Sequence, residues 1–243
     1  MLQNNNKAGV MNNEYAKNRG KRAELVFRYK CRAAIAAEAV RAHFQNTSEL
    51  NILDLGSADG RAMLELRSLL NPRSLTGVEL SGDIPSLIPE TIEDTKIIKG
   101  DITDLPPQVM SGSFDVVTAL AVLEHLPNPL STIEQVRKVL SPHGLFIATC
   151  PVPFWDKIST SAGLLKDSHH EDHLGESALR SLAVNAGLTV ESFNRFMWAP
   201  IAVIPYLRIP VPVKASLRID ALLRKIPLFK PLFVNQCLVA RKN

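Results

Sequence analysis

The stretch ILDLGSADG, residues 52–60, joins a short apolar run to a glycine-rich turn. The apolar run predicts a buried strand, and residues 60–70 follow with the apolar spacing of a helix. Leu75–Leu80 is apolar again, so the three pieces together predict a β-α-β unit. In an open α/β sheet such a turn lies at the carboxyl end of a strand, where ligands bind. We therefore expect a ligand site at this turn.

Further apolar runs extend this pattern along the chain. Phe114–Leu120 and Leu145–Cys150 are nearly continuous apolar runs, as expected for parallel strands covered on both faces. Strands alternate with helical patterns, which predicts a doubly wound α/β sheet. The remaining strand candidates are Lys96–Lys99, Leu188–Phe193 and Gln236–Ala240, and the helix candidates are Leu130–Leu140 and Glu176–Ala186.

The two ends of the chain differ from this middle. Residues 1–22 are rich in Asn and lack the apolar region of a signal peptide, so we predict disorder there. Residues 23–46 predict a long amphipathic helix. The stretch 196–213 is long and apolar but carries four prolines and Arg208, which argues against a membrane span. We interpret 23–243 as a single domain with an N-terminal helix, 23–46, and an insert, 196–234, before the last strand.

Composition excludes several classes of protein. With 46% hydrophobic and 21% charged residues, the chain is neither fibrous nor wholly disordered. Its three cysteines, Cys31, Cys150 and Cys237, lack the spacing of a disulfide scaffold or a zinc site, which favours the reducing cytoplasm.

The net charge of +4 is unevenly distributed. Residues 1–44 carry nine basic and three acidic side chains. Residues 45–191 carry ten basic and 20 acidic side chains, and residues 192–243 carry nine basic and one acidic. Basic ends around an acidic middle indicate a domain whose ends meet something anionic, and solvated basic side chains are the alternative.

The next two strands end in carboxylates that suit a nucleotide. Glu79 lies at the end of one strand and could accept hydrogen bonds from ribose hydroxyls. Asp101 follows another and, with Ile102, could hold the amino group and face of an adenine. The alternative for Asp101 is a turn or a helix cap. Arg61 stands where a dinucleotide fingerprint has its third glycine, which disfavours an NAD-dependent oxidoreductase.

Taken in order, six segments resemble the class I S-adenosylmethionine-dependent methyltransferases. They are similar in particular to the small-molecule group that includes methyltransferase type 11 and the ubiquinone-biosynthesis methyltransferases. The segments are ILDLGSADG (52–60), GVEL (77–80), GDI (100–102), FDVVTALAVLEHLPNP (114–129), IEQVRKVLSPHGLFIATCP (133–151) and AGL (186–188). The resemblance covers residues 48–195. It implies a Rossmann-like sheet of seven strands, mostly parallel with the last strand antiparallel, and S-adenosylmethionine as the cofactor.

The resemblance also implies roles for individual residues. The methionine part of the cofactor would contact the turn, with Asp54 directed to its amino group. Glu79 would bind the ribose, Asp101 and Ile102 the adenine, and Ala119 and Leu120 would pass near the methyl group. Ala58 departs from the family, which often has a second glycine there. The implied cofactor set is Asp54, Gly56, Ser57, Ala58, Gly60, Glu79, Leu80, Asp101, Ile102, Ala119 and Leu120.

Two histidines are candidate catalytic residues. His125 belongs to an EH pair that the family shares, and a histidine near neutral pKa can act as general base toward a hydroxyl acceptor. Its alternative is a structural role in the loop before Pro127. His173 follows the fifth strand, near the acceptor pocket that the resemblance implies. Together with His169 it lacks the HExxH pattern, so we predict no metal site.

The insert determines the expected partners. Its apolar residues are interspersed with basic ones, a composition typical of a peripheral contact with an anionic membrane, and a lid packed on the sheet and N-terminal helix is the alternative. We expect O- or C-methylation of a small-molecule or lipid- or glycan-linked acceptor. A non-catalytic S-adenosylmethionine-binding module is the alternative function. Aromatic residues, at 6%, give little support for nucleic-acid binding. The acceptor and the oligomeric state stay open.

Overall fold

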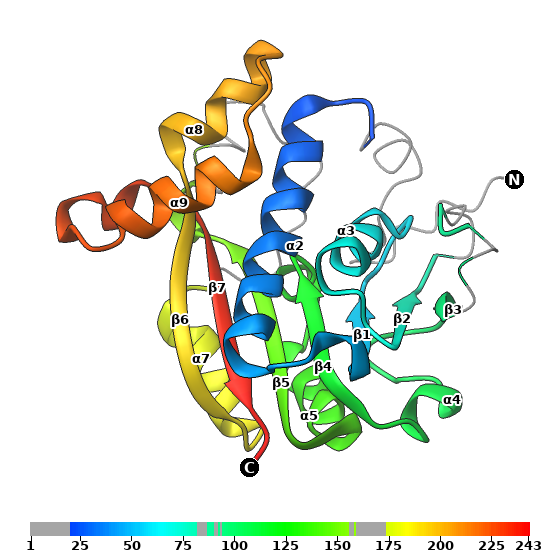
Figure 1. Ribbon diagram of the computed structural model, residues 1–243. Helices are drawn as coiled ribbons and strands as arrows, with labels where there is room; N and C mark the ends of the chain where they lie inside the picture. Colours follow the sequence, from blue (N-terminus) through cyan, green and yellow to red (C-terminus); the bar gives the residue numbers. More distant parts are fainter. Residues whose placement is uncertain (1–19, 82–86, 90–91, 93, 156–157, 159–173) are drawn as a thin grey trace, which may run out of the picture.

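The computed structural model describes residues 20–81, 87–89, 92, 94–155, 158 and 174–243 (Figure 1). Of the segment 1–22, for which we predicted disorder, only 20–22 are described. His169, His170 and His173 lie outside the described residues.

The centre of the molecule is a seven-stranded sheet in the order β3-β2-β1-β4-β5-β7-β6. Neighbouring strands are parallel from β3 to β5, and β7 is antiparallel to both β5 and β6. This confirms the predicted doubly wound sheet with an antiparallel last strand. The strands are β1 (Asn51–Leu55), β2 (Ser74–Glu79), β3 (Thr95–Lys99), β4 (Phe114–Leu120), β5 (Leu140–Pro151), β6 (Thr189–Trp198) and β7 (Phe233–Arg241).

Helices cover both faces of the sheet, and each face has its own core. Side chains alternate along a strand, so Ile52 of β1 packs with α2 (Ala23–His43) and α3 (Arg61–Leu70), whereas Leu53 packs with α5 (Pro129–Val139) and α7 (Glu176–Asn185). The shorter helices are α4 (Pro107–Met110), α8 (Ala199–Val203), α9 (Val213–Leu223) and the 3₁₀ turns η1 (Thr47–Glu49), η2 (Leu123–His125), η3 (Ile204–Leu207) and η4 (Pro227–Leu232).

The predicted boundaries of the N-terminal helix and of the insert are wrong. The N-terminal helix ends at His43 rather than at residue 46, because the backbone is already extended at Phe44. The predicted insert, 196–234, overlaps both flanking strands, since β6 continues through Trp198 and β7 begins at Phe233. Phe196 and Met197 are fully buried, so their apolar character belongs to the core. The segment between the two strands is therefore 199–232, which we call the connecting segment.

The three cysteines lie inside the sheet and the helix that covers it. Cys31 and Cys150 are fully buried and Cys237 is 2% exposed. Burial raises the pKa of Cys237 to about 12 and raises the pKa values of Cys31 and Cys150 as well. The thiolate is the reactive form, so the thiols are inert in the folded state.

We expect the native protein to resist alkylation by iodoacetamide at mildly alkaline pH. All three thiols become accessible, and their pKa values return to the ordinary range, when the chain unfolds in denaturant. Mass spectrometry of samples alkylated with and without denaturant measures this difference. Rapid labelling of any of the three cysteines in the native protein would contradict the burial described here.

Candidate functional site

The turn after β1 has a backbone that few residues adopt. Gly56, Ala58 and Gly60 all have positive φ, at 68°, 50° and 85°. A Cβ on Gly56 would lie 2.6 Å from Cγ2 of Val122, so the turn after β1 packs directly on the turn after β4. The backbone amides of Gly56 and Ser57 donate to the carbonyl of Val78, at 2.9 and 3.2 Å. The turn is thus held over the carboxyl end of β2.

Glu79, at the end of β2, fixes this turn with its side chain. Its Oε2 accepts from the amide of Ala58 at 2.8 Å, and its Oε1 accepts from the amide of Ser81 at 3.1 Å. The bond to Ala58 stabilises the left-handed backbone at a position where a side chain costs about 1–2 kcal/mol. Glu79 thereby compensates for the glycine that the family often has at position 58.

Glu79 also has capacity for a ligand. An ionised carboxylate offers about four acceptor sites, and the two backbone amides occupy one on each oxygen. The remaining sites suit the two hydroxyls of a ribose. Leu80, next in the chain, is 37% exposed at this edge of the sheet, which suits an apolar ring face. The residues present therefore fit a bound nucleoside.

Asp54 lies beneath the turn and is tied to β4. It is 2% exposed, and its Oδ1 accepts from the hydroxyl of Thr118 at 2.6 Å. The two residues are paired in the register of β1 and β4. Sequence reasoning missed Thr118, although a threonine among the apolar residues of 116–120 was a usable signal.

Ser57 presents its side chain to the sheet rather than to the open side of the turn. A Cβ placed on Gly77 would lie 2.6 Å from the Ser57 hydroxyl oxygen, so that hydroxyl lies against β2. The oxygen is buried without a hydrogen-bond partner among the described residues. Any contact of Ser57 with a ligand would use its backbone.

Asp101 forms the turn that was the alternative to adenine binding. Its Oδ1 accepts from the amide and the hydroxyl of Thr103, at 2.8 and 2.7 Å. The residue is exposed, and these bonds use only one carboxylate oxygen. Ile102 is 7% exposed. The turn and a role toward an exocyclic amino group are therefore compatible.

The comparisons with known proteins agree with this geometry. Residues 53–148 match the family model for a methyltransferase domain. The family comprises S-adenosylmethionine-dependent enzymes, and its model begins in β1 and ends in β5. The resemblance seen in the sequence is thereby confirmed.

One relative and two solved structures indicate how far the likeness extends. A ubiquinone biosynthesis O-methyltransferase from Dechloromonas aromatica is 33% identical over 103 residues, 40% of this chain and 43% of that protein. The chain thus spans less than half the length of the curated relatives it matches.

Both solved structures share the fold over most of the chain. Magnesium protoporphyrin IX methyltransferase from Synechocystis PCC 6803, solved with S-adenosylhomocysteine, has a TM-score of 0.62 at 12% identity, covering 95% of this chain and 96% of its own. An S-adenosylmethionine-dependent methyltransferase from Mesorhizobium loti has a TM-score of 0.57 at 17% identity, covering 84% and 96%. At this identity the likeness shows the fold alone.

Within the methyltransferase domain, the end of β4 is tightly packed. Ala119 is fully buried and Leu120 is 9% exposed, and Ala121 turns the chain with φ +60°. The amide of Ala121 donates to the carbonyl of Thr149 at 2.8 Å, which joins this turn to β5. The predicted role of Ala119 and Leu120 near a methyl group therefore depends on their backbone.

The EH pair lies in η2, directly after that turn. His125 is half-buried, whereas Glu124 is 3% exposed, with Oε2 lacking a hydrogen-bond partner among the described residues. Burial, together with the nearby Glu124 carboxylate, raises the pKa of the Cys150 thiol. Sequence reasoning named only the histidine of the pair, although the carboxylate is the more buried group.

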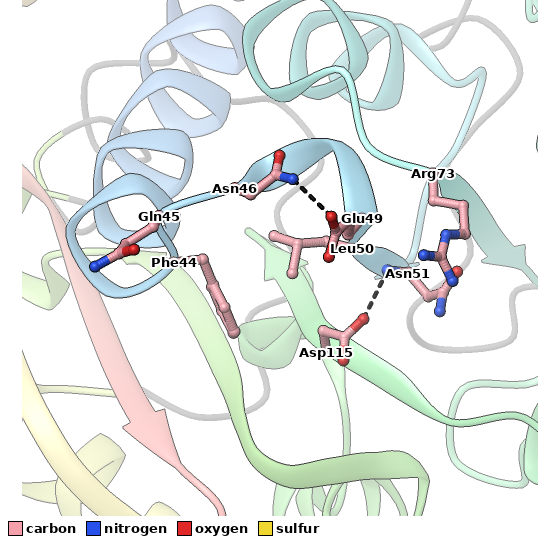
Figure 2. Close-up of a pocket in the computed structure, with 8 residues that line it drawn as sticks. All are labelled: Phe44, Gln45, Asn46, Glu49, Leu50, Asn51, Arg73 and Asp115. Carbon is pink, nitrogen blue, oxygen red and sulfur yellow. Dashed lines mark hydrogen bonds between the residues drawn. The ribbon is translucent and has the colours of Figure 1, made fainter.

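A separate pocket of about 410 Å³ lies at the amino ends of the parallel strands, at the opposite end of the sheet from the turn 56–60 (Figure 2). It is lined by residues at the starts of β1 and β4, where the amide of Asn51 donates to Oδ2 of Asp115 at 2.8 Å. No residue of the predicted cofactor set lines it. Among the described residues, no group of three or more His, Cys, Asp or Glu side chains could hold a metal ion.

Proposed function

We propose that this chain binds S-adenosylmethionine at the turn 56–60 and transfers its methyl group to a small-molecule or lipid- or glycan-linked acceptor. The observation that carries the proposal is Glu79, a buried carboxylate that fixes the turn and keeps two acceptor sites for ribose hydroxyls. The dinucleotide alternative lacks support, because Arg61 begins α3 where the fingerprint requires a glycine.

Different residues would bind different parts of the cofactor. Glu79 would hold the ribose, Leu80 and Ile102 the faces of the adenine, Asp101 its amino group, and the turn with Asp54 the methionine part. The bound cofactor supplies a methyl group on a positively charged sulfur. The chain has to orient the acceptor in line with that methyl group and exclude water, and orientation alone can contribute about 7–11 kcal/mol.

A hydroxyl acceptor must also lose its proton. His125 and Glu124 follow the end of β4 and are the two candidate general bases among the described residues. His173 remains a proposal as a third candidate. O-Methylation is the type that the ubiquinone-biosynthesis relatives suggest, and C-methylation would need the same positioning with a carbon nucleophile.

Thermal unfolding with added ligand tests the proposal. S-adenosylhomocysteine at about 100 times its dissociation constant contributes about 2.7 kcal/mol, which should raise the Tm by about 5–10 °C. NAD at the same concentration should have no effect. If neither S-adenosylhomocysteine nor S-adenosylmethionine raises the Tm, cofactor binding is refuted. Stabilisation without methyl transfer to any acceptor tried would favour a non-catalytic binding module.

A further inference from the structure

The connecting segment, 199–232, concentrates exposed apolar side chains. Seven of the 13 exposed large apolar side chains among the described residues lie in it, ranging from Ile219 at 39% to Leu228 at 79% exposed. They are Val203, Leu207, Ile209, Ile219, Leu222, Ile226 and Leu228. A monomeric protein exposes apolar side chains singly, and a concentration of them marks an interaction surface.

Helix α9 presents a continuous exposed face within this segment. Its buried residues, Ser216, Leu217 and Asp220, lie on one side. Ala215, Ile219 and Leu222 are exposed at spacings of four and three, so they lie on one stripe of the helix. Lys214 and Arg218, four residues apart, are exposed beside them, and Lys225 is exposed just past the end of the helix. The outward face of α9 is therefore apolar and basic.

This outward surface carries no exposed acid. The segment contains six basic residues and one acid, Asp220, which is fully buried. Within the described part of the chain, Arg208, Lys214, Arg218 and Lys225 have no ion pair or side-chain hydrogen bond. The charges of these four residues face solvent without an acidic partner, whereas Arg224 interacts with Glu38 and Lys230 pairs with Glu176.

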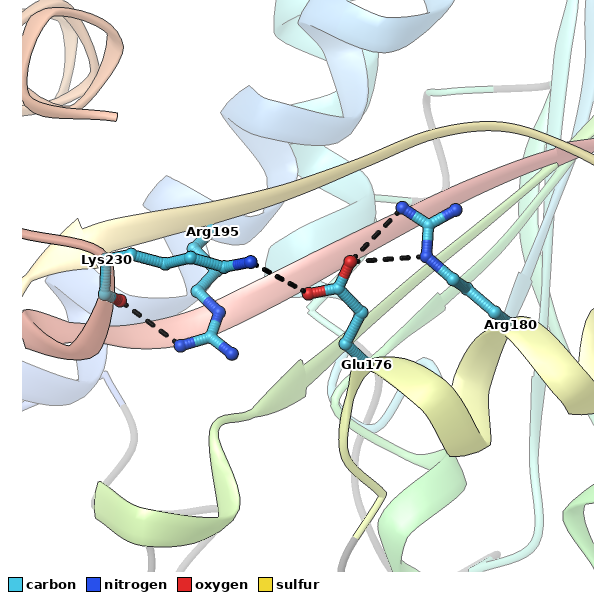
Figure 3. A network of polar contacts seen from close by, with 4 residues as sticks. All are labelled: Glu176, Arg180, Arg195 and Lys230. Carbon is cyan, nitrogen blue, oxygen red and sulfur yellow. Dashed lines mark hydrogen bonds and ion pairs between the residues drawn. The ribbon is translucent and has the colours of Figure 1, made fainter. Parts of the chain in front are cut away.

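Polar contacts of three of its residues, Tyr206, Asp220 and Lys230, hold the segment on the domain and leave that surface outside. Arg28 of α2 donates to the hydroxyl of Tyr206 at 2.7 Å, and Asp220 accepts from the amides of Met197 and Trp198 at 2.7 and 3.0 Å. At the other end, Lys230 pairs with Glu176 at 3.6 Å and its carbonyl accepts from Arg195 at 3.2 Å (Figure 3). The bond between Arg28 of α2 and Tyr206 fits the alternative in which the segment packs as a lid on the N-terminal helix, but it involves only the inner side of the segment.

The segment lies at the end of the sheet toward which the parallel strands point. In Figure 1, α8 and α9 lie beside the upper part of α2, beyond the arrowheads of β1 and β4. The turn 56–60 follows the same end of β1. A surface that held α9 would therefore lie on the side of the molecule where the methyltransferase domain has its proposed site.

We infer that the outward surface of the connecting segment docks on an anionic phospholipid membrane. Apolar side chains flanked by basic ones match the acyl boundary and the negative headgroups of such a membrane. A nucleic acid would leave the apolar stripe without a partner. No described helix is long and apolar enough to cross a membrane, so the contact is a peripheral one. This inference is independent of the proposed methyl transfer.

Vesicle co-sedimentation of the full chain tests the inference. We expect the protein to sediment with vesicles of equal parts phosphatidylcholine and phosphatidylglycerol at low salt, and to stay in solution with phosphatidylcholine alone. The triple variant Lys214→Glu, Arg218→Glu, Lys225→Glu should bind the anionic vesicles at least about 100-fold more weakly. The double variant Ile219→Ser, Leu222→Ser should bind at least about tenfold more weakly.

Matched controls lie on the opposite face of the sheet. Lys138→Glu in α5 and Val184→Ser in α7 change exposed side chains of the same kinds and should bind as the native chain does. All variants should keep the native Tm and the native affinity for S-adenosylhomocysteine, which separates this test from that of the proposed function. Failure of the native chain to bind anionic vesicles, or equal loss in the controls, would overturn the inference. Dimerisation through α9 without lipid would overturn it too.

Discussion

Replacing Glu79 by alanine should weaken the binding of S-adenosylhomocysteine by at least about 100-fold. The substitution removes two proposed hydrogen bonds from a charged acceptor to the ribose, each contributing about 1.5–3 kcal/mol. It also leaves the amide of Ala58 without the bond that fixes the turn. Isothermal titration calorimetry on the native and variant proteins measures the change in dissociation constant.

Two further variants separate ribose binding from support of the turn. Glu79→Gln keeps a side-chain oxygen that can accept from Ala58 but loses the charge, so its dissociation constant should lie between those of the native protein and Glu79→Ala. Glu134→Ala removes an exposed carboxylate from α5 and should leave binding unchanged. An unaltered dissociation constant in Glu79→Ala, with the fold intact by circular dichroism, would reject the assignment of Glu79.

The parts of this site that the sequence could predict are those that depend on local pattern. The glycine spacing at 56–60 and the acid after the next strand specify a turn and a carboxylate, and both lie where a parallel sheet would put them. The partners of each side chain depend on strands that are distant in sequence. The bonds of Asp54 to Thr118 and of Glu79 to Ala58 join residues 64 and 21 positions apart. No local pattern encodes these pairs.

The boundary of the connecting segment also depends on a contact between residues that are distant in sequence. Residues 196–198 have the apolar composition of the segment that follows, so composition could not separate strand from insert. Pairing with β7 decides the boundary, because Trp198 is the partner of Phe233. The charge of the segment was readable from the sequence, but the burial of Asp220 was not. That burial removes the segment's one acid from its surface.

Asp220→Ala should lower the free energy of unfolding by about 2–4 kcal/mol. Both carboxylate oxygens of this fully buried residue accept backbone amides, those of Met197 and Trp198. Met197 has φ +64°, so these bonds hold the strained end of β6. Each buried amide left without a partner costs about 1–3 kcal/mol. For a chain of this length the Tm should fall by about 5–15 °C in scanning calorimetry. Asp104→Ala, at an exposed position, should change it little.

The pH dependence of stability shows whether burial or the hydrogen bonds from the two amides has the larger effect on the pKa of Asp220. Burial raises the pKa of Asp220, and the amides of Met197 and Trp198 and the charge of Arg224 lower it by less. The folded chain therefore holds this proton more tightly than the unfolded chain does. The contribution of Asp220 to stability should fall as pH rises from the ordinary carboxyl range to the raised pKa, and should be constant above it. Asp220→Asn cannot titrate, so the native-minus-variant difference in unfolding free energy isolates this slope. Glu38, whose pKa burial also raises, is present in both proteins. A difference that increases with pH over that interval would mean that the amides outweigh burial, and Asp220 would then stabilise the end of β6 through its charge.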